Sequence, residues 1–214
     1  MGINAFLGSI YPAQESVLKS EPDVHYRVDD FANGKCNVLY ITGLSGSGKT
    51  TLAHELCDRF NAVYIELDRI EHYKDYMYRQ TGREDEMLLQ KYFRSQNESR
   101  NVNDMPDSEY EKFFMDAYEY LYQYTQRHKN RKFIFEGIQV VGRLHDRPEL
   151  WWNAIIVKGT SVLESYVRRK RRDGKMILNG IERTPVYMMA WYLNAEKWLK
   201  KFREECNRLN KNHG

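Results

Sequence analysis

"NVLYITGLSGSGKTTLAHELCDRF", residues 37–60, is the stretch that decides the fold. Its apolar first part, NVLYIT, stops at a glycine, and two more glycines follow before a lysine and two threonines. Apolar residues then recur at helical spacing, at Leu52, Leu56 and Phe60. The pattern predicts a buried strand, a tight glycine loop and an amphipathic helix, in that order.

The loop GLSGSGKT, residues 43–50, matches the phosphate-loop (Walker A) pattern G-x-x-x-x-G-K-[ST] in full. Its glycines let successive backbone N–H groups converge on a phosphate, and the following helix adds the positive end of its dipole. Lys49 is expected to reach the β- and γ-phosphates of a nucleoside triphosphate, and Thr50 to ligate Mg²⁺. The alternative is a glycine-rich turn without a ligand. The expected nucleotide-binding residues are Gly43, Leu44, Ser45, Gly46, Ser47, Gly48, Lys49, Thr50 and Thr51.

Composition and charge are those of an ordinary globular protein. Of 214 residues, 42% are hydrophobic and 29% charged, and the net charge of +3 does not indicate a nucleic-acid binder. The three cysteines form no C-x-x-C pair, so neither a disulfide framework nor a zinc site is indicated. The sequence shows no secretory signal pattern and no apolar run near the ~18 residues of a membrane span. We therefore expect a cytoplasmic protein that does not bind membranes.

Three further apolar runs resemble the first one in length and character. They are AVYIEL (62–67), KFIFEG (132–137) and NAIIVKG (153–159). Hydrophobicity is nearly continuous within each run, which is typical of strands buried on both faces of a parallel sheet. Helical patterns separate the runs, so we expect an α/β fold with a parallel sheet. Together with the phosphate loop, this succession of elements resembles that of P-loop NTPases, which implies a three-layer sandwich with strand order 2-3-1-4. The segment HYRVDDF (25–31) is a candidate for an added edge strand.

The expected domain organisation follows from these elements. Residues 1–34 have weak periodicity and are interpreted as an N-terminal extension of a domain at 35–214. Between the second and third strands, residues 69–131 form an enlarged, tyrosine-rich helical insert, and the resemblance to P-loop kinases implies that it binds the acceptor. We interpret the tyrosine stripe as helix packing, with a stacking platform for bases as the alternative. The same resemblance implies that the basic region at 160–184 is a lid.

The segment GLSGSGKTT resembles the phosphate loop of small-molecule and nucleotide kinases, including adenylylsulfate, uridine and shikimate kinases. The loop alone indicates a nucleoside triphosphate, because GTPases and ATPases share it. ELDRIE, residues 66–71, is similar to the carboxylate segment after the second strand of shikimate-type kinases, with Glu in place of the first Asp. The resemblance implies that Glu66 and Asp68 bind the acceptor, with Asp68 as acceptor ligand or general base. A helix N-cap is the alternative role of Asp68.

The third strand ends in FIFEGIQ, residues 133–139, which resembles the EGI segment of uridine kinase-like and pantothenate kinase-like enzymes. The resemblance implies that Glu136 supports Mg²⁺ or contacts the acceptor. The alternative is a strand-end residue that faces solvent. Gln139 and Arg143 follow directly and are candidates for lining the acceptor pocket.

The basic segment SYVRRKRRDGK, residues 165–175, stands where kinases of this kind place a lid. Arg168 and Arg172 are predicted to neutralise charge on the transferring phosphoryl group. The alternatives are a solvated basic helix face and a patch for nucleic-acid phosphates. ERTPVYMMA, residues 182–190, resembles the segment after the lid in shikimate-like kinases, which implies that Arg183 reaches the transferred phosphate or an acidic acceptor.

These features predict a Mg²⁺-dependent kinase that transfers the γ-phosphoryl group of ATP, or of GTP, to a small-molecule or nucleotide acceptor. One alternative is a polynucleotide or zeta-toxin-like kinase acting on nucleic-acid ends or sugar nucleotides. Another is a regulatory nucleotide-binding module without transferase activity. The resemblance also implies a fifth strand after the lid, which this chain lacks unless its N-terminal arm replaces it. The acceptor is not named by the sequence, and a homodimer is compatible with it.

Overall fold

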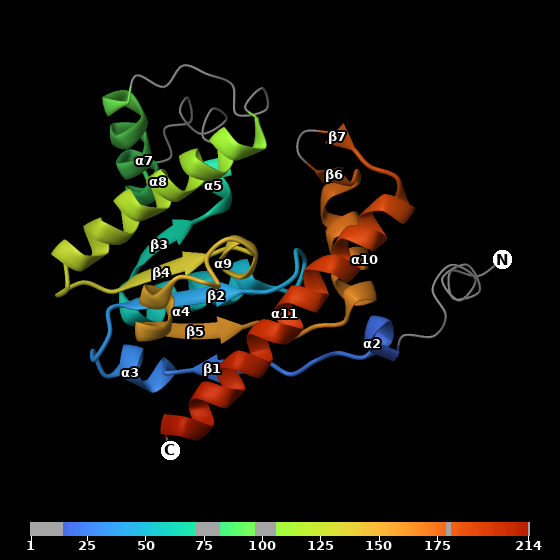
Figure 1. The fold of residues 1–214 in the computed structure, drawn as a ribbon, viewed down its shortest axis with the longest axis horizontal. Coiled ribbons are helices and arrows are strands. Elements are labelled where there is room, and N and C mark those ends of the chain that lie inside the picture. Colours follow the sequence, from blue (N-terminus) through green and yellow to red (C-terminus); the bar gives the residue numbers. More distant parts are fainter. Residues whose placement is uncertain (1–14, 72–81, 97–105, 179–180, 214) are drawn as a thin grey trace.

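The computed structural model describes residues 15–71, 82–96, 106–178 and 181–213. Its main sheet has five strands in the order β1-β5-β2-β4-β3 (Figure 1). The strands are β1 (Val24–Tyr26), β2 (Val38–Thr42), β3 (Val63–Glu66), β4 (Phe133–Glu136) and β5 (Ala154–Val157). Four of them are parallel, and β1 is antiparallel to β5. The α/β prediction is confirmed, with a mixed sheet in place of a wholly parallel one.

Read from β3 to β5, the parallel strands are the second, third, first and fourth along the chain. All five residues of β2 are buried, which explains why its apolar run does not alternate. Val38 and Tyr40 join one hydrophobic cluster, whereas Leu39 and Ile41 join another on the opposite face. Central strands of this sheet therefore need helices on both sides.

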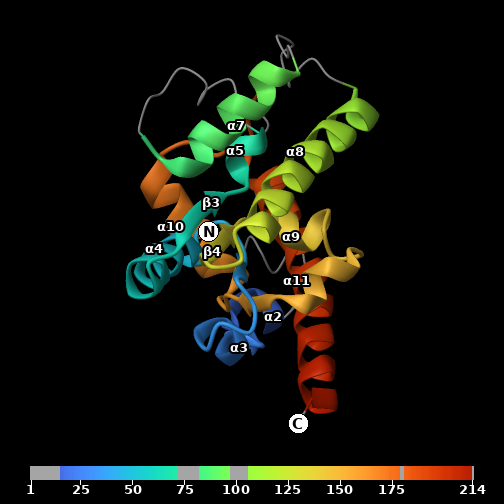
Figure 2. The same ribbon diagram turned by 90° about the vertical axis from the view of Figure 1, so that its left-hand side faces the viewer.

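Helices cover both faces of the sheet and give three layers (Figures 1 and 2). One face packs against α3 (Val28–Ala32) and α4 (Lys49–Phe60). The other face packs mainly against α8 (Asp107–Arg127), α9 (Gln139–Gly142) and α11 (Pro185–His213). The remaining described elements are α2 (Glu15–Leu18), α5 (Asp68–Glu71), α7 (Glu84–Ser95), the 3-10 helix η2 (Pro148–Trp152), α10 (Val162–Asp173) and the hairpin strands β6 (Ile177–Leu178) and β7 (Ile181–Glu182).

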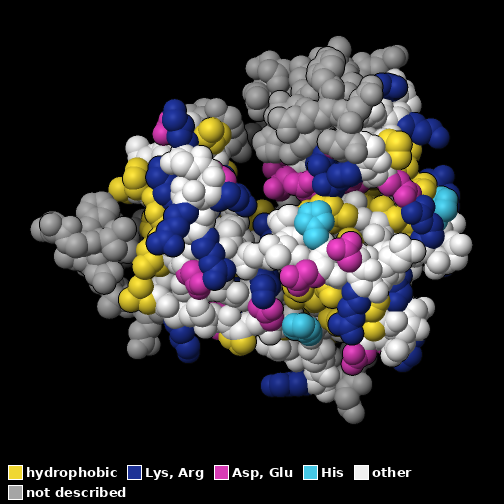
Figure 3. Space-filling model, turned by 180° about the vertical axis from the view of Figure 1, so that it is seen from behind, with side chains coloured by type: hydrophobic (Ala, Val, Ile, Leu, Met, Phe, Trp, Pro, Cys, Tyr) yellow, Lys and Arg dark blue, Asp and Glu magenta, His cyan; other side chains and the backbone are white. Residues whose placement is uncertain are grey.

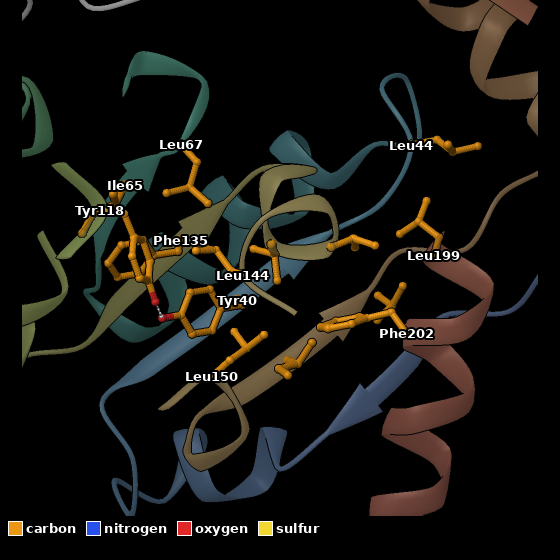
Figure 4. Packing of buried hydrophobic residues seen from close by; sticks show 14 of the residues in the cluster. Tyr40, Leu44, Ile65, Leu67, Tyr118, Phe135, Leu144, Leu150, Leu199 and Phe202 are labelled. Atoms are coloured by element: carbon orange, nitrogen blue, oxygen red, sulfur yellow. Dashed lines mark hydrogen bonds between the residues drawn. The ribbon is translucent and has the colours of Figure 1, made fainter. Parts of the chain in front are cut away.

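The larger cluster contains a buried tyrosine pair (Figure 4). The hydroxyl oxygens of Tyr40 on β2 and Tyr118 on α8 lie 2.6 Å apart and share a hydrogen bond. Burial raises the pKa of Tyr40, so both hydroxyls stay protonated and each has a partner in the apolar interior. Tyr118 shows that the tyrosine-rich helix uses at least part of its aromatic face for packing.

The N-terminal strand β1 occupies the edge of the sheet beside β5. Asp23, which precedes it, accepts hydrogen bonds from Lys158 Nζ at 2.7 Å and from the Gly159 backbone N–H at 2.8 Å. Helix α11 packs over β1 from the other end of the chain. Residues 24–26 thus add to the sheet of the domain that was expected to begin at residue 35, and they lie at the edge left open after β5.

The insert between β3 and β4 is helical where it is described, in α5, α7 and α8. Its residues 72–81 and 97–105 lie outside the described residues. The basic region forms α10 and the β6-β7 hairpin, which lead into α11. Figure 1 shows these two lobes on either side of the loop that follows β2. In the described parts of the chain, every helix is too short or too polar to cross a membrane.

Candidate active site

The phosphate loop connects β2 to α4, as predicted from its glycines. Gly43, Gly46 and Gly48 have φ angles of 150°, 91° and 88°, in the region that side chains with a Cβ disfavour. The Ser47 hydroxyl is buried and has no hydrogen-bond partner among the described residues. A phosphate oxygen would satisfy this donor, so the loop fits the group that its sequence predicts.

The other residues of the loop differ in which of their groups are available to bind a nucleotide. The side chain of Leu44 is buried in the core, and Thr51 is exposed on α4. The Ser45 carbonyl already accepts a hydrogen bond from Tyr192 Oη at 2.8 Å. Leu44 can therefore contribute to nucleotide binding only through its backbone.

Glu136, at the end of β4, joins the residues expected to hold the phosphates and the metal. Its Oε1 lies 3.1 Å from Lys49 Nζ, in a buried ion pair. Its Oε2 accepts hydrogen bonds from Thr50 Oγ1 at 3.3 Å and from Tyr64 Oη at 2.8 Å. The Thr50 hydroxyl and this carboxylate are oxygen donors of the kind Mg²⁺ binds, so the pair fits the predicted metal.

Tyr64 was not identified from the sequence. It lies on β3. Burial is the main cause that raises the pKa of its hydroxyl, and the neighbouring Glu136 charge is the second. The Arg83 guanidinium lies 4.4 Å from the centre of its ring. An aromatic residue in the middle of a buried strand is read as core, and only the pairing of β3 with β4 shows which carboxylate it reaches.

Asp68 begins α5, directly beyond the end of β3. Gln139 Nε2 donates a hydrogen bond to Asp68 Oδ1 at 2.6 Å, while the buried Gln139 Oε1 has no partner among the described residues. Asp68, Gln139 and Lys49 line the same cleft. The structure thus brings the predicted acceptor residue to the phosphate loop.

This cleft has a volume of about 870 Å³ and lies between the insert, α9, the β6-β7 hairpin and α11. Its described lining residues are Ser45, Lys49, Asp68, Glu71, Glu111, Ile138, Gln139, Val141, Gly142, Arg143, Arg169, Ile177, Leu178, Tyr187, Trp191, Asn194, Ala195 and Trp198. The volume is that of a small-molecule site.

Glu66 is not brought to the cleft with Asp68. Arg69 Nε donates to its carboxylate at 3.0 Å, and Arg83 Nη1 lies 3.4 Å from it. Burial raises the pKa of Glu66, which these two guanidinium groups partly oppose. The reason is local: β3 ends at Glu66 and α5 begins at Asp68, so strand alternation does not extend between them.

The predicted lid arginines lie on the exposed side of α10. Arg168 pairs with Glu164, and Arg172 Nε lies 2.6 Å from Asp173 Oδ1. Their side chains are 53% and 63% exposed. Figure 3 shows several Lys and Arg side chains on this lobe, seen from behind. Both arginines remain predictions, and this structure does not place them in the cleft lining.

Arg169 lines the cleft instead, with a side chain only 14% exposed. Its Nη2 donates to the Ile177 carbonyl at 2.7 Å, and its Nε lies 3.4 Å from Asp173 Oδ2. Arg169 was not among the arginines predicted from the sequence to contact the phosphoryl group. The signal that could have identified it is helical spacing, since Arg169 follows the buried Val162 and Tyr166 at i+7 and i+3.

Two other predicted acceptor residues lie in different places. Arg143 lines the cleft and pairs with Glu71 and, at 3.0 Å, with Glu111. Arg183 lies outside the described lining, with its guanidinium 4.8 Å from the Tyr187 ring centre. Of these two arginines, only Arg143 lies in the cleft lining, where it could contact an acceptor.

Helix α10 packs directly on the phosphate loop. A Cβ placed on Gly46 would lie 2.4 Å from the Ser165 carbonyl oxygen and 3.3 Å from the Arg169 backbone nitrogen. Helix α10 and the loop can approach this closely only because Gly46 has no side chain.

We predict that Gly46→Ala destabilises the protein more than Gly34→Ala. Both glycines have positive φ, but a Cβ at Gly34 meets nothing within 4 Å. The Gly34 variant should lose about 1–2 kcal/mol from backbone strain. The Gly46 variant adds the collision with α10 and should also bind ATP more weakly. Urea unfolding and ATP titration measure both effects, and equal losses of stability in the two variants would contradict the packing argument.

Comparison with known families bears on the nucleotide-binding part of the chain. Residues 38–135 match the family model described as an AAA domain, which is P-loop NTPase-like and includes kinases. The match runs from β2, through the phosphate loop and the insert, to β4. The chain therefore carries a nucleotide-binding P-loop domain. No curated protein matches the chain.

Proposed function

We propose that the protein is a kinase that transfers the γ-phosphoryl group of ATP to a hydroxyl group of an acceptor bound in the cleft. The observation that carries this proposal is that one cleft contains Lys49 of the phosphate loop, Asp68 with its Gln139 partner, and Arg169. A cation for the phosphates, a carboxylate for the acceptor and a lid guanidinium are the parts that phosphoryl transfer requires.

In the proposed reaction, Asp68 accepts the proton of the acceptor hydroxyl as its oxygen forms a bond to the γ-phosphorus. The bond between the γ-phosphorus and the β–γ bridging oxygen breaks, and ADP leaves. Gln139 orients the Asp68 carboxylate through its 2.6 Å hydrogen bond. Lys49 and Arg169 stabilise the negative charge on the phosphate oxygens.

Thr50 and Glu136 would hold Mg²⁺, which when bound neutralises charge on the β- and γ-phosphates. Tyr64 and Lys49 fix the Glu136 carboxylate from two sides. Glu136 thus contacts both Lys49, which would bind the phosphates, and Thr50, whose hydroxyl would bind the metal. Its carboxylate therefore links the positions of these two side chains.

A transfer assay tests the proposal. The protein is incubated with Mg²⁺ and ATP or GTP labelled at the γ-phosphate, together with nucleosides, sugars, amino alcohols, small acids and oligonucleotides. We expect label to move to at least one class of hydroxyl compound. ATP binding without transfer to any acceptor would contradict the kinase and favour a regulatory module. Labelling of oligonucleotide ends alone, with strong salt dependence, would favour the polynucleotide alternative.

A further inference from the structure

The charged residues of the cleft separate into two groups. Lys49 belongs to the phosphate loop, and the backbone of Arg169 lies against that loop at Gly46. These two cations serve the phosphate end. The other charged residues of the described lining are Asp68, Glu71, Glu111 and Arg143. The acceptor end therefore has three carboxylates and one guanidinium.

That guanidinium is already engaged by the chain. Arg143 pairs with Glu71 and lies 3.0 Å from Glu111 Oε2. Its guanidinium also lies 4.9 Å from the Tyr110 ring centre and 4.6 Å from that of Phe114. Binding an anionic acceptor would require Arg143 to leave these partners. The described acceptor end thus keeps an excess of negative charge.

The facing wall of the cleft is aromatic and comes from α11. Tyr187, Trp191 and Trp198 line it, and Tyr187 and Trp198 are each 48% exposed. Two of these rings already hold a cation of the chain, with Arg183 4.8 Å from the Tyr187 centre and Lys201 Nζ 5.0 Å from the Trp198 centre. No such contact is described for Trp191. Aromatic faces opposite carboxylates suit a ligand with an apolar or ring-shaped body and positive charge.

We propose that the acceptor is a hydroxyl compound that carries a protonated amine, of the amino sugar, aminocyclitol or amino alcohol class. This inference rests on the kinase proposed above. The hydroxyl lies at Asp68, the ammonium group faces Glu71 and Glu111, and the body of the acceptor packs against Trp191. Anionic acceptors such as nucleotides and nucleic-acid 5′ ends are disfavoured by the same carboxylates.

The test uses acceptors matched in skeleton and different in charge. Transfer from ATP is measured with amino sugars, aminocyclitols and amino alcohols, with the same skeletons lacking the amine, and with their phosphate esters. We expect kcat/KM to be about tenfold or more higher for the amines than for the neutral parents, and lowest for the phosphates. Preference for the neutral or phosphorylated series, or for oligonucleotide ends, would overturn the inference while leaving a kinase in place.

A charge variant sharpens this test. Glu111→Gln should raise KM for the amine about tenfold with little change in KM for the neutral parent or for ATP. Glu71→Gln provides a second, independent variant in case one of them folds poorly. Glu55→Gln, exposed on α4, is the matched control. An unchanged preference for the amine in both cleft variants would contradict the assignment. Absence of transfer to any class refutes the kinase and this inference together.

Discussion

Lys49→Ala should lower phosphoryl transfer by about 10²–10³-fold in a protein that still folds. The Lys49 ammonium group is the cation of the phosphate loop, and it lies in a buried pair, 3.1 Å from Glu136 Oε1. Removing it takes away positive charge where negative charge develops in the transition state. ATP affinity should fall as well, because in the proposed site the same group binds the phosphates before transfer begins.

Two measurements separate this loss from unfolding. Truncating one partner of a buried ion pair leaves the other charge uncompensated, which costs roughly 3–5 kcal/mol of stability. Thermal melting must therefore show that Lys49→Ala is folded at the assay temperature, and Lys49→Ala combined with Glu136→Gln removes the stranded charge. Lys35→Ala, whose side chain is 70% exposed beside Asp30, is the matched control. Normal turnover by a folded Lys49→Ala protein would refute the role of the loop.

Asp68→Asn should lower transfer by about 10²–10⁴-fold and leave ATP binding unchanged. Asparagine keeps the side-chain oxygen that accepts the 2.6 Å hydrogen bond from Gln139, so the geometry is retained and only the charge and basicity are lost. The chain positions Asp68 through the insert and α9, so the phosphate loop should not sense the change. Single-turnover transfer and ATP titration give the two quantities.

The control for this change is Asp58→Asn, an exposed aspartate on α4. The pH dependence of the transfer rate distinguishes two roles for Asp68. Loss of a general base removes one limb of the pH–rate profile, whereas loss of a residue that only positions the acceptor leaves both limbs. Near-normal transfer by Asp68→Asn would show that another group accepts the proton. A parallel loss of ATP affinity would show instead that Asp68 acts at the nucleotide.

The strands of the sheet and the phosphate loop could be predicted from the sequence, because each depends on residues within one short segment. The parallel strands β2, β4 and β5 are buried on both faces, so the residues of each form one continuous apolar run that identifies it without any partner, whereas β3 lies at the edge of the sheet and is only partly buried. The glycines at 43, 46 and 48 have positive φ because the chain must turn there, and the Walker A pattern records this requirement. Lys49 was predicted from the same pattern, and Glu136 from its place at the carboxyl end of an identifiable strand, in a segment that resembles the EGI of uridine kinase-like enzymes.

Side-chain partners across the fold were harder to predict. Glu66 was expected beside Asp68, but the change from strand to helix separates them, and Arg69 and Arg83 bind Glu66. The segment RRKRR offers several cations in a row, and the packing of α10 on Gly46 is what places Arg169 in the cleft. Tyr64 reaches Glu136 only through the register of two strands that lie far apart in the chain. Such contacts depend on tertiary geometry, which no short pattern contains.

The position of β1 has a consequence for how the chain is made. Val24 pairs with Val157, so β1, the first strand among the described residues, is synthesised long before the strand it pairs with. Non-local pairing of this kind slows folding, and it delays closure of the sheet until most of the domain has been synthesised. Once β5 has been made, its sequence AIIV can pair with β1 of the same chain or with a strand of another chain. By occupying this edge, residues 24–26 leave β5 less open to such intermolecular pairing.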